Sequence, residues 1–409
     1  MILVIYNVFL VLMLFILYST GKQIAKTGTI LSSAGIIAIL TYTLNEGLRY
    51  GRGIDYNLYG MSYEELEAGR ESDWDLSFQY IARFLISLNI PWQGYVLLMS
   101  FVFILATIIL LKSYKEVLPY ALPLYALFSM SHVENMVRWY MGFSFVMIGL
   151  SFLLEGEKGA NKRFWLFSAI ACTFHIALLP LPVVFYLLQR KEKVLLTPIW
   201  VCILYFGIGF FFQTEFMMRF VELANIMGMM LGGVSERFQN YGDDAEYWLT
   251  GGFAGAEARS AFPNKQEILF LLCVVWLGYK VIKDFDKKYI FVYNMFVVGL
   301  LTNPIALQIE LVGRFNAPFM FFRAIVLACI IKHVFVNKTI MVNQMAWLFS
   351  LLIVLNMGRK ILVTPFTQDP DKYLYIWNNK GKSYRSMYEM WIYDMYEADS
   401  KKKKSEKNE

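Results

Sequence analysis

The chain has 409 residues, of which 57% are hydrophobic and 17% are charged, and its formal net charge is +6. Soluble proteins are typically about 25% charged, so this composition excludes an ordinary soluble protein. The apolar residues fall in blocks separated by short basic stretches, which predicts an all-α, polytopic membrane protein. The positive charge lies in those stretches and in a terminal KKKK, so it indicates orientation in a membrane and no nucleic-acid partner.

The first part of the chain contains five predicted spans, oriented by the positive-inside rule. Lys22 and Lys26 follow the first apolar run, which lacks the basic start of a signal peptide, so we place the N-terminus outside. Residues 48–91 form an outer segment, within which 77–90 has the period of an interfacial amphipathic helix. The predicted spans are, in order, 2–19, 29–47, 92–111, 117–131 and 137–154.

Residues 164–193 form an apolar stretch with basic residues at both ends. A single helix of this length, at about 1.5 Å per residue, would cross the membrane and leave one basic cluster outside. His175, Pro180 and Pro182 interrupt the stretch near its middle. We therefore predict a broken pair of short helices or a re-entrant hairpin here.

The remainder of the chain adds five spans, which brings the prediction to about ten transmembrane helices plus the broken element. The first two of these spans are separated by a long outer loop, 214–265, that is rich in glycine and acidic residues. We assign residues 1–358 to one transmembrane domain and residues 359–409 to a polar C-terminal tail. The added spans are 194–212, 266–282, 289–303, 317–331 and 339–357.

This topology brings arginines from separate segments to the outer face. A guanidinium donates two parallel hydrogen bonds and suits phosphate, and a pyrophosphate at the membrane edge would need several such groups. The arginines in question are Arg49, Arg52, Arg138 and Arg314. The alternative is that they make independent salt bridges; the candidate carboxylates are Glu46, Asp55, Glu134 and Glu310.

His175 stands at the predicted break, where irregular backbone inside a membrane normally lines a cavity. It is either a satisfied core residue or a functional one. The sequence has no Walker, GxGxxG or HExxH motif, and its cysteines have no CxxC spacing. The triplet of Asp73 and Asp75 could hold a metal on the outer face, but we interpret it as a chance occurrence. We predict no cofactor, no metal site and no disulfide.

Ordered motifs in this chain resemble those of the EpsG family, membrane proteins related to the Wzy polysaccharide polymerases. The first motif is RYGRGIDYNLY, which carries Arg49 and Asp55 at the matching places. The second begins at NMVRW, continues through a basic loop and ends in a small-residue stretch with Phe-His. It carries Arg138 and His175.

The third motif is ELVGRFNAPF, with Glu310 and Arg314, and a final TPF resembles the closing Pro-aromatic pair of the family. The likeness covers about residues 1–370, in order and at matching spacing. This chain departs from the family pattern at Arg52, a position that is usually apolar, and at Trp139, which replaces the usual Gln.

The resemblance implies a fold similar to the GT-C class of glycosyltransferases and a polymerase of O-antigen, capsule or exopolysaccharide. Such an enzyme joins oligosaccharide repeat units carried on undecaprenyl diphosphate, at the outer face of the cytoplasmic membrane, without nucleotide sugar or metal. The expected partners are the lipid-linked oligosaccharide and membrane lipid, with a chain-length regulator and the flippase of the same pathway.

The resemblance also implies roles for the motif residues. The arginines would bind the diphosphate leaving group and neutralise the charge that develops on it; they are Arg49, Arg52, Arg138 and Arg314. Asp55 or His175 would orient or deprotonate the acceptor hydroxyl. The predicted sugar contacts are Tyr56, Tyr59, Glu134 and Glu310. The two tyrosines could instead anchor the chain at the membrane interface.

Two other functions remain open at this stage. A ligase or single-sugar transferase would use the same lipid carrier and the same chemistry. A flippase or other transporter would use the arginines to bind its cargo, but it would more often show an internal repeat, and we find none. A scaffold protein would not need clustered cationic groups.

Overall fold

The protein is described here from a computed structural model. The structure describes residues 2–71, 74–212, 262–337, 351–356, 358, 370–379 and 381–393. Within these ranges the chain forms helices, turns and one isolated β-bridge, so the prediction of an all-α protein is confirmed. The predicted loop 214–265 and span 339–357 lie mostly outside the described residues, and the terminal KKKK lies wholly outside them.

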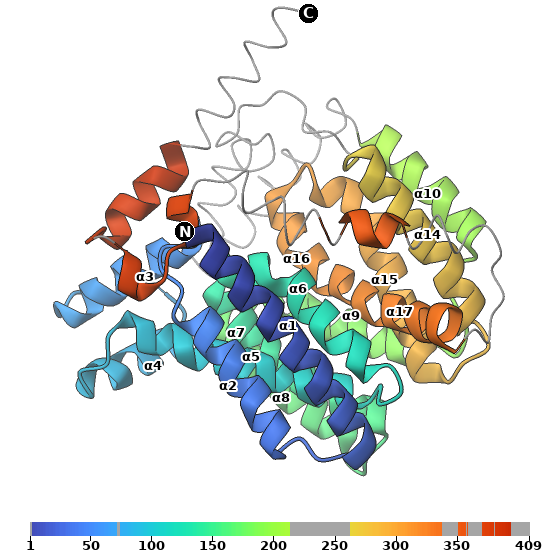
Figure 1. The fold of residues 1–409 in the computed structure, drawn as a ribbon, viewed down its shortest axis with the longest axis horizontal. Helices are drawn as coiled ribbons and strands as arrows, with labels where there is room; N and C mark the ends of the chain where they lie inside the picture. Colours follow the sequence, from blue (N-terminus) through green and yellow to red (C-terminus); the bar gives the residue numbers. More distant parts are fainter. Residues whose placement is uncertain are drawn as a thin grey trace, which may run out of the picture.

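Figure 1 shows the arrangement of the helices, and most connections from α1 to α10 and from α14 to α17 are short. The first group is α1 (Ile2–Thr27), α2 (Ser33–Gly47), α3 (Ile54–Glu67), α4 (Leu76–Ser87), α5 (Trp92–Lys112), α6 (Leu118–Asn135) and α7 (Val137–Glu155). The second group is α8 (Ala160–Phe174), α9 (Pro180–Gln189), α10 (Pro198–Phe211), α14 (Lys265–Ile282), α15 (Lys287–Ala306), α16 (Glu310–Phe321) and α17 (Arg323–Ile330). A π-helical turn, Ile331–Val336, follows α17, and residues 384–393 form a further helix.

Five helical segments of the described chain are long and apolar enough to cross a membrane, by length and composition. They are α1, α5, α7, α15 and the stretch Val312–Val336, which covers most of α16 and all of α17. Each coincides with a predicted span. Helices α2, α6, α10 and α14 lie at four other predicted spans but are shorter or less apolar, so the count of ten stays a prediction.

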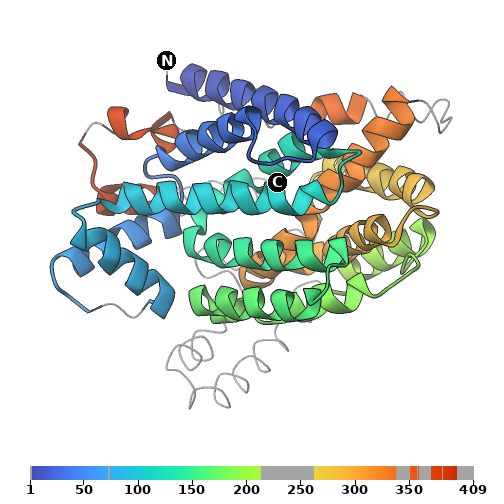
Figure 2. The ribbon, with the colours of Figure 1, turned by 90° about the horizontal axis from the view of Figure 1, so that it is seen from below.

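The long helices run side by side, and α3 and α4 lie together at one end of them (Figure 2). We call this end, which includes residues 48–53, the site end. At the opposite end, which we call the basic end, Lys332 pairs with Glu116 at 2.8 Å and the hydroxyl of Tyr114 lies 3.4 Å from the carbonyl oxygen of Lys288. The basic turns of several helices therefore meet at one end, as the positive-inside reading requires.

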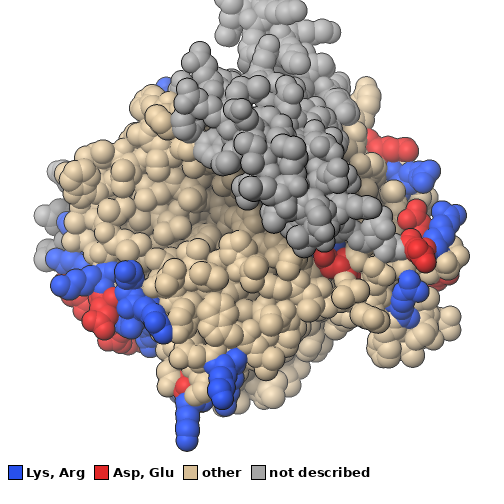
Figure 3. All heavy atoms as spheres, turned by 180° about the vertical axis from the view of Figure 1, so that it is seen from behind, with Lys and Arg blue, Asp and Glu red and all other residues tan. Residues whose placement is uncertain are grey.

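The surface between the two ends is uncharged over a broad area (Figure 3). Large apolar side chains are exposed on several of the helices, among them Phe15 of α1, Ile199 of α10 and Trp276 of α14. A soluble protein rarely exposes a contiguous apolar surface of this kind, whereas lipid tails solvate it without cost. The apolar helices and this surface define a multi-pass membrane protein.

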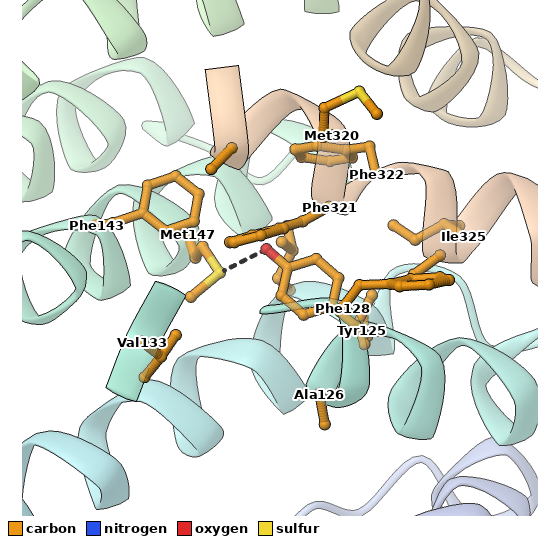
Figure 4. Packing of buried hydrophobic residues seen from close by; sticks show 14 of the residues in the cluster. Tyr125, Ala126, Phe128, Val133, Phe143, Met147, Met320, Phe321, Phe322 and Ile325 are labelled. Atoms are coloured by element: carbon orange, nitrogen blue, oxygen red, sulfur yellow. Dashed lines mark hydrogen bonds between the residues drawn. The ribbon is translucent and has the colours of Figure 1, made fainter. Parts of the chain in front are cut away.

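Aromatic side chains fill the centre of the bundle (Figure 4). Tyr125 of α6 packs edge-on against Phe321 of α16, with ring centroids 5.8 Å apart, and its hydroxyl lies 3.2 Å from the sulfur of Met147. Helices α7 and α8 approach closely because α7 presents glycine: a Cβ on Gly149 would lie 3.1 Å from the carbonyl oxygen of Phe164. Small residues at contacts of this kind let membrane helices pack backbone to backbone.

The predicted break in residues 164–193 is confirmed. Helix α8 ends at Phe174, His175 adopts an extended conformation, and α9 begins only at Pro180. Helix α9 then returns to the basic end, where the side-chain amide of Gln189 donates to the carbonyl oxygen of Leu153 at the end of α7. The element is therefore a hairpin that keeps both of its basic ends on the same side.

The predicted amphipathic helix in the outer segment is also confirmed, as α4. Phe78, Ala82 and Leu85 are buried on one face, while Tyr80 and Phe84 on the other face are exposed. Helix α3, over residues that carried no helix prediction, packs beside it.

Candidate functional site

The site begins with the turn between α2 and α3. Gly51 and Gly53 have φ angles of +67° and +106°, which an L side chain rarely adopts, and they turn the chain back over the bundle. A Cβ on Gly53 would lie 2.4 Å from Oδ1 of Asn135. This close approach lets Oδ1 accept the backbone N–H of Asp55 at 2.9 Å, which fixes the start of α3 on the end of α6.

Arg49 is fully buried at the end of α2. Its guanidinium donates to the carbonyl oxygens of Glu46, Val133 and Glu134, the last two at 3.3 Å. The ring of Tyr56 lies 5.4 Å from it. Among the described residues no carboxylate lies within ion-pair distance of Arg49, so neutral carbonyl dipoles hold a buried positive charge.

Arg52 lies beside Arg49 and has a different environment. Its Nη1 contacts Oε1 of Glu134 at 2.7 Å, in a pair that is nearly buried. The rings of Tyr6 and Tyr375 lie 5.0 and 4.7 Å from the guanidinium carbon. Burial acts to lower the pKa of Arg52, but the charges of Glu134 and Glu46 outweigh burial and raise the pKa above its usual value. The guanidinium therefore stays protonated.

Arg138 enters the site from the first turn of α7. It forms an ion pair with Asp75, the residue that precedes α4. The ring of Trp74 lies 4.4 Å from its guanidinium carbon and that of Tyr59 lies 5.5 Å from it. Arg138 is thus held between α3 and the start of α4.

Arg314 of α16 pairs with Asp55 of α3 at 3.6 Å. This pair is more exposed than the other two, since the side chain of Arg314 is 22% exposed and that of Arg52 only 3%. Arg314 is therefore the most exposed of the four arginines, and the side chains of Arg49, Arg52 and Arg138 are buried.

Tyr59 shows how closely these groups lie together. Burial raises the pKa of Tyr59 to about 12; the charges of Arg138 and Arg314 oppose that rise and the charge of Asp55 adds to it. All three charged groups therefore act on one hydroxyl, although they come from α7, α16 and α3. Tyr59 stays neutral at physiological pH.

His175 reaches the same region through aromatic contacts. Its ring lies edge-on to Trp139, 4.8 Å between centroids, and Trp139 lies 5.3 Å from Phe315, the neighbour of Arg314. The break between α8 and α9 places His175 at the site end. Trp139, which stands where the family usually has Gln, is the ring that connects His175 to α16.

The structure thus brings the predicted arginines, Asp55, Glu134 and His175 to one end of the bundle. Three of the arginines make ion pairs with carboxylates, and the pair of Arg138 with Asp75 was not predicted. The side chain of Glu310 lies outside the described residues. Tyr56 is fully buried, and its hydroxyl lies 3.1 Å from the carbonyl oxygen of Arg49. Sugar contacts by the two tyrosines stay a prediction.

Other residues of the site were missed by the sequence analysis. Asp75 was considered only as part of a DxD triplet, and its ion pair with Arg138 depends on the packing of α4 against α3, α5 and α8. Asn135 and Gln93 carried no charge to single them out; the side-chain amide of Gln93 donates to the carbonyl oxygens of Gly47 and Arg49. Tyr375 was not predicted as a site residue, because it lies in the predicted polar tail. Among the described residues, no group of three His, Cys, Asp or Glu side chains could hold a metal ion.

The fold and the site define a multi-pass membrane protein with a cluster of arginines and carboxylates at one end of its helices. The chain belongs to the EpsG family, whose sequence pattern matches residues 34–368. This family is associated with Wzy-like polysaccharide polymerases. No curated protein and no solved structure matches the chain. The matched region contains all the predicted site residues and ends before residue 370.

Proposed function

We propose that this protein polymerises undecaprenyl-diphosphate-linked oligosaccharide repeat units into a surface polysaccharide. The observation that carries the proposal is the partly exposed Arg314, paired with Asp55, at the same end of the bundle as the buried Arg49, Arg52 and Arg138. Burying arginines is costly, and a site that stabilises a doubly charged leaving group gives a reason for that cost. Family membership supports the same chemistry.

The reaction we propose is glycosyl transfer. The acceptor hydroxyl oxygen attacks the anomeric carbon of the donor sugar, and a glycosidic C–O bond forms. The bond between that carbon and the phosphate oxygen breaks, and undecaprenyl diphosphate leaves with the electron pair. The hydroxyl proton passes to a base at the site, for which Asp55 and His175 are the two candidates. We propose that the reaction uses neither a metal nor a nucleotide sugar.

The arginines would act on the leaving group. Guanidinium groups already fixed by protein contacts stabilise a developing anion without reorganising during the reaction. Asp55 and Arg138 lie in the first turns of α3 and α7, and helix N-termini carry partial positive charge. Helix dipoles and side chains therefore favour an anion at the same place.

We infer that the site faces outward from the cytoplasmic membrane. The support is the basic end of the bundle, where Lys288, Lys332 and the turns around Glu116 lie together. Basic ends of membrane proteins face the cytoplasm. We also propose that the chain has about ten transmembrane helices plus the broken element, in a GT-C-like architecture. The same predicted topology supports this proposal.

The test is to incubate the purified protein in detergent with lipid-diphosphate repeat units and no nucleotide sugar. We expect a ladder of lengthening products on a gel. A single transfer without a ladder would indicate the ligase alternative. Unchanged substrate would indicate a flippase or a scaffold, and in either case the polymerase proposal fails.

Arg314→Ala is the variant that tests the site. Loss of one fixed donor to the leaving group should slow the ladder by about 10²–10³-fold. Arg163→Ala is the matched control, because Arg163 pairs with Glu157 at the exposed basic end and should leave the rate unchanged. Elution of both variants at the wild-type position on size exclusion would show that they are folded. A wild-type rate in Arg314→Ala would remove Arg314 from the mechanism.

A further inference from the structure

The described residues near the C-terminus, 370–379 and 381–393, pack against the turn between α2 and α3, and we call them the C-terminal cap. The backbone N–H of Tyr50 donates to the carbonyl oxygen of Leu374 at 2.9 Å. The backbone N–H of Ile376 donates to the carbonyl oxygen of Leu48 at 3.0 Å. These bonds flank the β-bridge between Arg49 and Tyr375. Figure 1 shows the cap in red beside α3 and the N-terminus.

Side chains of the cap hold the same turn from outside. The indole N–H of Trp391 donates to the carbonyl oxygen of Gly51 at 2.7 Å. A Cβ on Gly51 would lie 2.4 Å from Cε of Met387, which is fully buried. The ring of Tyr384 stacks on Tyr50, with centroids 5.2 Å apart. The turn that carries Arg52 is therefore clamped between the bundle and the cap.

Tyr375 is the cap residue that reaches the arginine cluster. Its ring lies 4.7 Å from the guanidinium carbon of Arg52. Its hydroxyl donates to Oδ1 of Asn45 at 2.9 Å, and the amide of Asn45 donates to Oε1 of Glu46 at 2.6 Å. One buried tyrosine thus orients both a cation and, through Asn45, a carboxylate next to it.

We propose that the cap completes the site of this protein and that Tyr375 is a positioning residue for Arg52. The inference rests on the proposed function. The cap lies after residue 368, outside the region that matches the family.

The experiment compares Tyr375→Ala, Tyr375→Phe and Tyr393→Ala in the full-length protein. Removing the ring should lower kcat for ladder formation by about tenfold and change KM less, because Arg52 would act on the leaving group. Phenylalanine keeps the ring and should restore most of the rate. Tyr393 is an exposed tyrosine of the same cap, and its replacement should have no effect. Equal rates in all of these variants would overturn the inference.

Hydrogen exchange of residues 45–53 gives a readout that does not depend on the reaction. Tyr375→Ala should speed exchange of the Tyr50 amide, and Tyr375→Phe should not. If the wild type makes no ladder, the proposed function fails, and faster exchange in Tyr375→Ala would still support positioning by the cap. Unchanged exchange in that variant would overturn the positioning role.

Discussion

The two ends of the bundle use the same chemistry in opposite environments. At the site end Arg52 pairs with Glu134, and the side chain of Arg52 is 3% exposed. At the basic end Arg163 pairs with Glu157, and the side chain of Arg163 is 47% exposed. An exposed pair costs little and contributes little. A buried pair carries a desolvation penalty of the same order as the attraction between its members.

The different burial of the charges at the two ends indicates which end suits a charged ligand. Stability alone does not explain several buried arginines, because apolar residues of similar volume would serve as well or better. The basic end needs its charges only to stay in water and to set orientation. The site end holds its charges in fixed positions, with Arg314 more exposed than Arg52 and Arg138, and this arrangement suits the charged ligand that we propose.

The largest effect that would test this comparison is expected for Glu134→Ala. The change leaves Arg52 buried without its carboxylate, which should cost about 3–5 kcal/mol of unfolding free energy. Glu157→Ala, at the basic end, should cost less than about 1 kcal/mol. Thermal unfolding of the two detergent-solubilised variants measures both. Similar losses would mean that the two ends do not differ in the way we describe.

A second prediction concerns glycines at the two ends. In Gly53→Ala, the new side chain would stand on a residue with a φ of +106°, and its Cβ would lie 2.4 Å from Oδ1 of Asn135. The substitution should therefore lower the free energy of unfolding by about 3 kcal/mol. Gly156 ends α7 with a φ of +68° and nothing within 4 Å of its Cβ position, so Gly156→Ala should cost about 1 kcal/mol. The melting temperatures of the two variants show which substitution costs more stability. A smaller loss in Gly53→Ala than in Gly156→Ala would contradict the prediction.

The smallest effect is expected at Glu116. The hydrogen bond from Lys332 holds the pKa of Glu116 below its usual value. A carboxyl with a lowered folded-state pKa stabilises the fold above its unfolded-state pKa, and that contribution is lost as the pH falls through the folded-state pKa. Lys332→Ala should abolish this dependence of stability on acid pH. It should lower the free energy of unfolding by less than about 1 kcal/mol. An unchanged pH profile of melting would show that the pair contributes nothing.

Much of the fold followed from local pattern. The apolar runs at 92–111 and 137–154 correspond closely to α5 and α7, and the period of 77–90 predicted α4. Helix α3 was missed because its tyrosines and acids do not show a clear apolar face. It is held instead by contacts that its own sequence does not contain, such as the bond of Asp55 to Asn135.

The sequence by itself determined which segments are apolar enough to cross a membrane and which of their ends carry basic charge, because hydropathy and loop charge are local properties. It also determined the break at His175, because proline cannot continue a helix interior. Tertiary structure alone decided that Arg138 pairs with Asp75 and that Tyr375 lies on Arg52. Those contacts join residues far apart in the chain, and only the packing of whole helices brings their side chains within reach.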